Sequence, residues 1–262
     1  MNIALATAWH PRGELQRFLK IYPTLEQVYS ILAISVPPSS DPKEFGPLDE
    51  LPKVSVVVTQ NWSWGRHLAL RRSMQSSAEQ IQYADFDRLV RWVEVQPDEW
   101  RRVATSLHGA DCTIIERSEK AWETHPRALR QTEKISNVAL ADLLGKIYDL
   151  SAGSKVFSRR AARFVLANSE VAEDEPGKAL GTDGEWPVLL KRGGFVLKSL
   201  LVDGLDWESA DRFRENAASP AEQRLAAEAY DADPRNWERR VQVALEIVEA
   251  GLAAAKRPFV YP

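Results

Sequence analysis

With 262 residues, the chain is long enough for one large α/β domain or two small ones with a sizeable core. A hydrophobic fraction of 44%, a charged fraction of 27% and a formal net charge of −3 are ordinary for a soluble globular protein and give no general attraction to nucleic acid, so no nucleic-acid partner is expected. The single Cys112 excludes an internal disulfide, and no apolar run approaches the roughly 18 residues that span a bilayer, so we expect a cytoplasmic protein without a transmembrane segment.

Apolar strands alternate with helical segments in the first part of the chain. Short apolar runs at residues 2–7, 30–36 and 54–59 predict strands. Between the first two, helical spacing of apolar residues predicts a helix that is interrupted or restarts at Pro23. Continuous apolar strands separated by helices are typical of a mostly parallel sheet covered on both faces.

A glycine and a cation follow the third predicted strand. Gly65 and Arg66 end a predicted loop, residues 60–66, that leads into a helix at 67–74. A small residue and a cation at a helix entrance can approach a phosphate, and free backbone N–H groups add to the attraction. A loop glycine with a solvated arginine explains the same pattern equally well.

Two aspartates mark the next junction between a strand and a helix. Ile81, Tyr83 and Ala84 predict the end of a short strand, and helical spacing begins directly after Asp85 and includes Asp87. In open α/β sheets ligands bind at the carboxyl ends of strands, and carboxylate oxygens suit Mg²⁺ or Mn²⁺ bridging a diphosphate. A structural role fits the pair as well, with Asp85 as a helix N-cap and Asp87 in the first turn.

The second half of the chain is predicted to be mainly helical. The pattern predicts a helix at 97–107, a strand at 111–117, helices across 118–149, a helix at 161–167 and a pair of strands within 195–202. Residues 170–182 are polar and contain Pro176 and Gly177, which predicts a mobile loop.

A charged helical tail closes the chain. Six apolar residues of this tail fall on one helical face: Trp237, Val241, Ala244, Leu245, Val248 and Leu252. Glutamates and arginines occupy the opposite side, so the helix is expected to pack on the domain or on a second subunit, as in a homodimer, rather than on a membrane.

Taken together, these features resemble a divergent family-two glycosyltransferase with the GT-A fold. The resemblance spans about residues 1–205 and is specific at four places. Asp85 and Asp87 are similar to the family's metal and donor-diphosphate motif, and Gly65–Arg66 is similar to its Gly-Lys or Gly-Arg step. Residues 153–159 are similar to the family's Gly-x-x-x-Phe-x-Arg segment. Asp183 and Glu185 fall where the family carries an acidic base.

The resemblance implies a fold, an activity and a set of site residues. It implies a GT-A domain at residues 1–205, a helical extension at 206–262, and transfer of a sugar from a nucleotide-diphosphate donor to the hydroxyl of an unknown acceptor. The implied roles are donor binding by Gly65, Arg66, Asp85 and Asp87, binding of Mg²⁺ or Mn²⁺ by Asp85 and Asp87, catalysis by Asp183 or Glu185, and acceptor contacts by Lys155, Arg159 and Trp186. Asp183 also fits a plain helix cap.

One departure from the family keeps two alternatives open. After the first strand the family commonly has Pro-x-Tyr-Asn-Glu, whereas this chain has Thr-Ala-Trp-His-Pro at residues 7–11. An inactive GT-A-like scaffold or binding protein is therefore one alternative, because a fold does not fix a function. A sugar-phosphate nucleotidyltransferase is less favoured, since residues 8–13 do not resemble its glycine-rich, arginine-containing loop.

Overall fold

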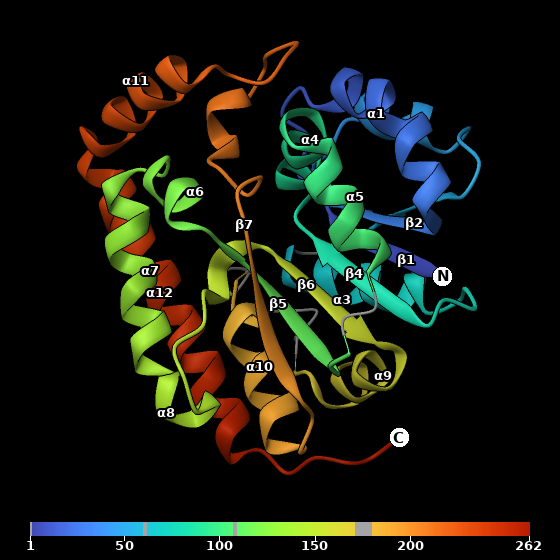
Figure 1. The fold of residues 1–262 in the computed structure, drawn as a ribbon, viewed down its shortest axis with the longest axis vertical. Helices are drawn as coiled ribbons and strands as arrows, with labels where there is room; N and C mark the ends of the chain where they lie inside the picture. The colour runs from blue at the N-terminus through green and yellow to red at the C-terminus, as the bar shows by residue number, and fades with distance from the viewer. Residues whose placement is uncertain (1, 60–61, 107–108, 171–179) are drawn as a thin grey trace.

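A seven-stranded sheet forms the centre of the computed structural model, which describes residues 2–59, 62–106, 109–170 and 180–262, without the side chains of Trp62 and Ser63 (Figure 1). The strands are β1 (Ile3–Ala8), β2 (Tyr29–Val36), β3 (Val54–Val58), β4 (Gln80–Ala84), β5 (Cys112–Arg117), β6 (Ser154–Ser158) and β7 (Leu197–Val202). Their order is β3-β2-β1-β4-β6-β5-β7, and β6 alone among them runs antiparallel to its neighbours. The sequence prediction of a mostly parallel α/β sheet is confirmed.

Helices cover both faces of the sheet, and each face has its own hydrophobic core. In β1, Ile3 and Leu5 belong to one core and Ala4 and Ala6 to the other, because successive side chains of a strand point to opposite faces. The first core includes residues of α1 (Leu15–Val28), α4 (Phe86–Val95) and α5 (Pro97–Thr105), and the second includes residues of α3 (Trp62–Ser73), α9 (Arg159–Asn168), α10 (Thr182–Arg192) and α12 (Pro234–Lys256).

The remaining helical segments connect or flank these elements. They are α2 (Pro42–Phe45), α6 (Glu119–Glu123), α7 (Arg127–Ala139), α8 (Ala141–Leu144), α11 (Pro220–Asp231) and three 3-10 turns, η1 (Gly46–Leu48), η2 (Leu150–Ala152) and η3 (Glu208–Asp211). None of the helices in the described part of the chain is long and apolar enough to cross a membrane.

Three local predictions differ from the structure. The helix α1 continues through Pro23, because the buried Phe18, Ile21 and Leu25 pack on the sheet and outweigh the hydrogen bond that a proline removes. The helix α3 begins before Gly65, so Gly65 and Arg66 lie in a helix and not in a loop. The predicted strand pair within 195–202 is a single strand, β7, parallel to β5.

Parts of two predicted loops lie outside the described residues. These are residues 60–61, before Gly65, and residues 171–179, within the segment predicted to be mobile.

The C-terminal helices pack closely on the rest of the chain. In Figure 1, α12 lies beside α7, and it also packs against α10. Of the six residues predicted to pack on the domain or on a second subunit, Ala244 is buried, but Val241, Leu245 and Leu252 are exposed in the single chain. The stripe that packs within the chain is Val243, Ala244, Ile247, Gly251 and Ala254, which includes small residues because two helices approach closely there. Packing of the exposed face on a second subunit stays a prediction.

Candidate functional site

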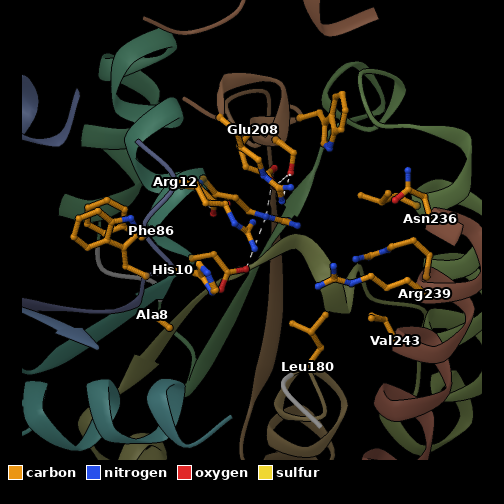
Figure 2. A pocket seen from close by; sticks show the side chains of 18 of the residues that line it. Ala8, His10, Arg12, Phe86, Leu180, Glu208, Asn236, Arg239 and Val243 are labelled. Atoms are coloured by element: carbon orange, nitrogen blue, oxygen red, sulfur yellow. Dashed lines mark hydrogen bonds and ion pairs between the residues drawn. The ribbon is translucent and has the colours of Figure 1, made fainter. Parts of the chain in front are cut away.

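A pocket of about 650 Å³ lies at the carboxyl ends of β1 and β4 (Figure 2). One wall comes from the residues after β1, including His10 and Arg12, and the floor comes from the junction of β4 and α4. The opposite wall comes from the C-terminal segment, including Glu208 and Arg239. A volume in this range suits a small-molecule ligand.

Asp85 lies at the end of β4, on the floor of the pocket, and its charge is already compensated. Its Oδ1 accepts hydrogen bonds from the Tyr83 hydroxyl at 2.6 Å and from Arg66 Nη2 at 2.9 Å. Gly153 adopts a φ of +76°, and a Cβ at that position would lie 2.7 Å from Asp85 Oδ2. The glycine therefore leaves room for this carboxylate.

Arg66 is the centre of a buried charge cluster below the pocket. Its side chain is 1% exposed, and it donates hydrogen bonds to Asp85 and, through Nη1, to Asp183 Oδ2 at 3.1 Å. Lys155 Nζ donates to the other oxygen of Asp183 at 2.8 Å. Burial alone would raise the pKa of Asp183, but the charges of Lys155 and Arg66 outweigh burial and lower that pKa to about 2.

Asp87 and Glu208 bring two further carboxylates to the pocket. Glu208 is 7% exposed, its Oε2 has no hydrogen-bond partner, and Arg88 Nε lies 3.6 Å from it. Asp87 accepts a hydrogen bond from the Arg88 backbone N–H at 3.0 Å. Burial raises the pKa of Asp87 to about 7, and repulsion by Glu208 and Asp85 adds to the effect. The pKa of Glu208 is lowered in spite of its burial by the charges of Arg88 and Arg212, so arginines flank this pair of carboxylates.

The donor set fits a divalent cation that is shared with a ligand. Carboxylate oxygens are the ligands that Mg²⁺ and Mn²⁺ prefer, and Mg²⁺ is commonly held by one or two carboxylates together with substrate phosphates. Among the residues that the structure describes, no three or more His, Cys, Asp or Glu side chains converge to hold a metal ion by themselves. Phosphate oxygens would complete the coordination.

The two residues predicted to be catalytic lie in the first turn of α10, outside the pocket lining. Asp183 is bound by Arg66 and Lys155, as described above. Glu185 accepts hydrogen bonds from the Glu170 backbone N–H at 2.8 Å and from Arg257 Nη1 at 2.7 Å. This geometry does not support a proton-accepting role, because both carboxylates are buried and already accept hydrogen bonds.

The residues predicted to contact the acceptor also lie outside the pocket lining. Trp186 is buried in the second core, where its ring meets Tyr83 and Phe157 edge to face. Arg159 donates hydrogen bonds to backbone carbonyls between β4 and the end of α3. Gly65 also lies outside the pocket lining. A Cβ at this position would lie 3.0 Å from Ser35 Oγ, so the absence of a side chain at Gly65 allows α3 to lie close to β2.

Sequence reasoning missed the residues of the opposite wall. Glu208 and Arg212 of that wall fall in residues 206–262, which the sequence predicts to be an extension. On the first wall, residues 7–11 depart from the family pattern, so no pocket residue is predicted there. One signal was present, because Asn236, Arg239 and Val243 are three and four residues apart and so share a helix face. All three line the pocket.

Comparison with known proteins identifies the fold family of the chain through solved structures. No family sequence model matches the chain, and no curated protein is significantly similar to it in sequence. The chain is similar in structure to glucosyl-3-phosphoglycerate synthase from Mycobacterium tuberculosis in complex with Mn²⁺, UDP and phosphoglyceric acid, with a TM-score of 0.54 and 14% identity over 98% of this chain and 79% of that one. It is also similar to mannosyl-3-phosphoglycerate synthase from Rubrobacter xylanophilus, with a TM-score of 0.51 and 12% identity over 92% of this chain and 74% of that one. The chain therefore has the GT-A fold that the sequence predicts.

Proposed function

We propose that the chain is a metal-assisted glycosyltransferase that moves a sugar from a nucleoside-diphosphate donor to an acceptor hydroxyl. The observation that carries this proposal is the pair of carboxylates, Asp87 and Glu208, in a pocket at the carboxyl end of β4 of a GT-A fold. The M. tuberculosis synthase of this fold was crystallised with Mn²⁺ and UDP, which supports the same ligand class here.

Asp87 and Glu208 are the residues that would hold the divalent cation. Bound there, a cation would supply positive charge to the diphosphate as the sugar leaves it. Asp85 lies beside Asp87 but is bound by Arg66 and Tyr83, so we assign it a weaker share in metal binding and a role in orienting Arg66.

Arg66 serves the donor side. It lines the pocket, and its Nε is buried without a hydrogen-bond partner. Asp183 accepts a hydrogen bond from Arg66 and is itself bound by Lys155, so Asp183 acts on the reaction through Arg66 as a positioning residue. In this scheme Gly65 supports donor binding indirectly, by letting α3 lie close to β2.

The acceptor side is formed by the C-terminal segment. Lys155, Arg159 and Trp186 lie outside the pocket lining, whereas Arg212 and residues of α12 line it, so we assign the acceptor contacts to Arg212 and α12. Residues 206–262 therefore belong to the active unit rather than to an appended extension.

Nucleotide binding with and without metal tests the proposal. Thermal unfolding is followed with UDP, GDP and their sugar conjugates, each with and without Mn²⁺. A productive nucleotide at about a hundred times its dissociation constant stabilises the protein by about 2.7 kcal/mol. Because the coordination needs phosphate oxygens, we expect Mn²⁺ alone to stabilise far less than Mn²⁺ with the nucleotide.

Asp87→Asn is the decisive variant. It is expected to lose the Mn²⁺-dependent part of nucleotide binding and to lower turnover by about a hundredfold or more, the scale of losing one preorganised stabilising group. Asp49→Asn, an exposed residue after η1, removes the same charge far from the pocket and serves as the control. No stabilisation of the wild type by any nucleotide sugar would favour the inactive scaffold instead.

A further inference from the structure

Three arginines from separate parts of the chain meet in the pocket. Arg12 follows β1, Arg212 follows η3, and Arg239 lies on α12. Figure 2 shows Arg12 and Arg239 entering the pocket from opposite walls. We call Arg12, Arg212 and Arg239 the arginine cluster.

A backbone contact holds two of these arginines side by side. The Phe213 N–H donates a hydrogen bond to the Arg12 carbonyl at 2.8 Å. Phe213 has a φ of +59°, which is uncommon for a residue with a side chain, and its side chain is 78% exposed, so burial does not hold it there. Strained backbone of this kind gathers at functional sites.

Gly13 makes this contact possible. Its φ is +92°, and a Cβ there would lie 2.8 Å from the Cα of Phe213. Only glycine therefore lets the loop after β1 approach the C-terminal segment so closely. The contact brings the segments that carry Arg12 and Arg212 together at one edge of the pocket.

Among the described residues, no carboxylate forms an ion pair with Arg12, Arg212 or Arg239. Burial lowers the pKa of Arg12 most, and repulsion by Arg212 lowers it further. Asp87 and Glu14 attract Arg12 and raise its pKa, each by more than the repulsion by Arg239 lowers it.

The arginines with buried side chains are paired within the chain. Arg17, Arg66, Arg91 and Arg117 each form ion pairs with two carboxylates. Arg12 is half-buried and Arg212 and Arg239 are exposed, and all three line one pocket without an ion pair to a described residue, so their guanidinium groups are accessible to an anion from outside the chain.

We infer that the arginine cluster binds a phosphate group, and that this phosphate belongs to the sugar acceptor. Guanidinium groups match phosphate oxygens in geometry as well as in charge. The donor diphosphate carries the same chemistry, but its proposed place is beside Asp87 and Arg66 on the floor of the pocket. Arg239 lies instead on α12, on the wall opposite Arg12 (Figure 2). The assignment of the phosphate to the sugar acceptor rests on the proposed glycosyltransferase function. The presence of a phosphate site does not depend on that function.

Phosphate binding by a single-residue variant tests the inference. The probe is inorganic phosphate near neutral pH, measured by calorimetry and by thermal unfolding, and UDP with Mn²⁺ is titrated in parallel. Arg239 is exposed, so Arg239→Gln should leave the fold intact. The variant should bind phosphate about tenfold more weakly or worse, because a hydrogen bond to a charged group is worth at least that factor. Its affinity for UDP with Mn²⁺ should stay within about twofold of the wild type.

Arg163→Gln is the matched control, because Arg163 is exposed on α9 and is not part of the pocket. It removes the same charge and should leave both affinities unchanged. Equal phosphate binding by Arg239→Gln and Arg163→Gln would overturn the inference, as would no saturable phosphate binding by the wild type.

Two further outcomes separate the inference from the proposed function. If Arg239→Gln loses UDP with Mn²⁺ and phosphate together, the cluster holds the donor diphosphate and the acceptor assignment is wrong. If the wild type binds phosphate through the cluster but binds no nucleotide, the phosphate site stands, the glycosyltransferase proposal fails, and the acceptor assignment fails with it.

Discussion

Asp183 illustrates how a single buried residue can be decisive without touching the pocket. It is 3% exposed and accepts hydrogen bonds from both Arg66 and Lys155, which are each 1% exposed. Buried charges are tolerated only when they are paired, and removing one partner leaves the others uncompensated. The folded state therefore depends on Asp183 being ionised.

This dependence predicts the response of the protein to acid. The pKa of Asp183 falls from 3.8 to about 2 on folding, which corresponds to about 2 kcal/mol of stability. A lowered pKa gives stability that is fully present above about pH 4 and is lost as the pH falls toward 2. Urea unfolding of the wild type and of Asp183→Asn across this range measures the effect.

The neutral-pH difference between the two proteins should be about 3 kcal/mol or more, because the variant leaves two buried cations with a weaker partner. That difference should shrink by about 2 kcal/mol as the pH is lowered. A difference that does not change with pH would show that Asp183 does not titrate in the predicted range. Asp49→Asn, at an exposed site, should show neither effect.

The sequence predicted residues well where their role is local. Asp85 and Asp87 were placed correctly at the junction of β4 and α4, because strand and helix periodicity change at that point. The burial of Asp183 was not predictable, because Arg66 is 117 residues away in the chain and Lys155 is 28 residues away. Such a cluster exists only after the sheet has brought α3, β6 and α10 together.

At the scale of elements, the contact between α10 and α12 sets the position of the C-terminal wall. A Cβ at Gly184 would lie only 2.2 Å from the carbonyl oxygen of Ile247, so the backbones of the two helices nearly touch. The same α12 carries Arg239 into the pocket. The spacing of these helices therefore couples the second core to the proposed acceptor site.

Gly184→Ala tests this coupling. Alanine favours a helix over glycine by about 1 kcal/mol, but here the added methyl must push α12 away from α10. Overpacking of this kind costs about 1–3 kcal/mol, so we expect a net loss in the free energy of unfolding and weaker phosphate binding. Gly46→Ala is the control, because nothing lies within 4 Å of its Cβ position. A variant as stable as the wild type would mean that the two helices do not pack this closely.

Some elements could not be read from the sequence for a physical reason. The strand β6 has the sequence Ser-Lys-Val-Phe-Ser, which lacks the continuous apolar run expected of a central strand. Its Lys155 is nevertheless buried, because it is paired with Asp183. The strand also runs antiparallel between β4 and β5, and that direction depends on long-range pairing. Periodicity therefore predicts whether a segment is a helix or a strand more reliably than it predicts which strands pair with it.

At the scale of the whole molecule, the C-terminal segment belongs to both layers of the fold. On one side, Asp211 accepts hydrogen bonds from Arg17 of α1 and Arg91 of α4, each at 2.7 Å. On the other side, Val243 and Ile247 of α12 belong to the second core. The boundary predicted at residue 205 therefore falls within a structure that depends on both sides of it.

A fragment of residues 1–205 is accordingly expected not to fold. Losing Val243 and Ile247 alone removes about 3–6 kcal/mol of apolar burial, against a typical total stability of about 5–15 kcal/mol. It also leaves Arg17 and Arg91 each without at least one buried carboxylate partner. Circular dichroism and urea unfolding of the purified fragment measure this, with the full chain as the reference. A fragment that unfolds cooperatively would establish residues 1–205 as an independent domain, and the C-terminal wall would then be an addition to a complete nucleotide-binding unit.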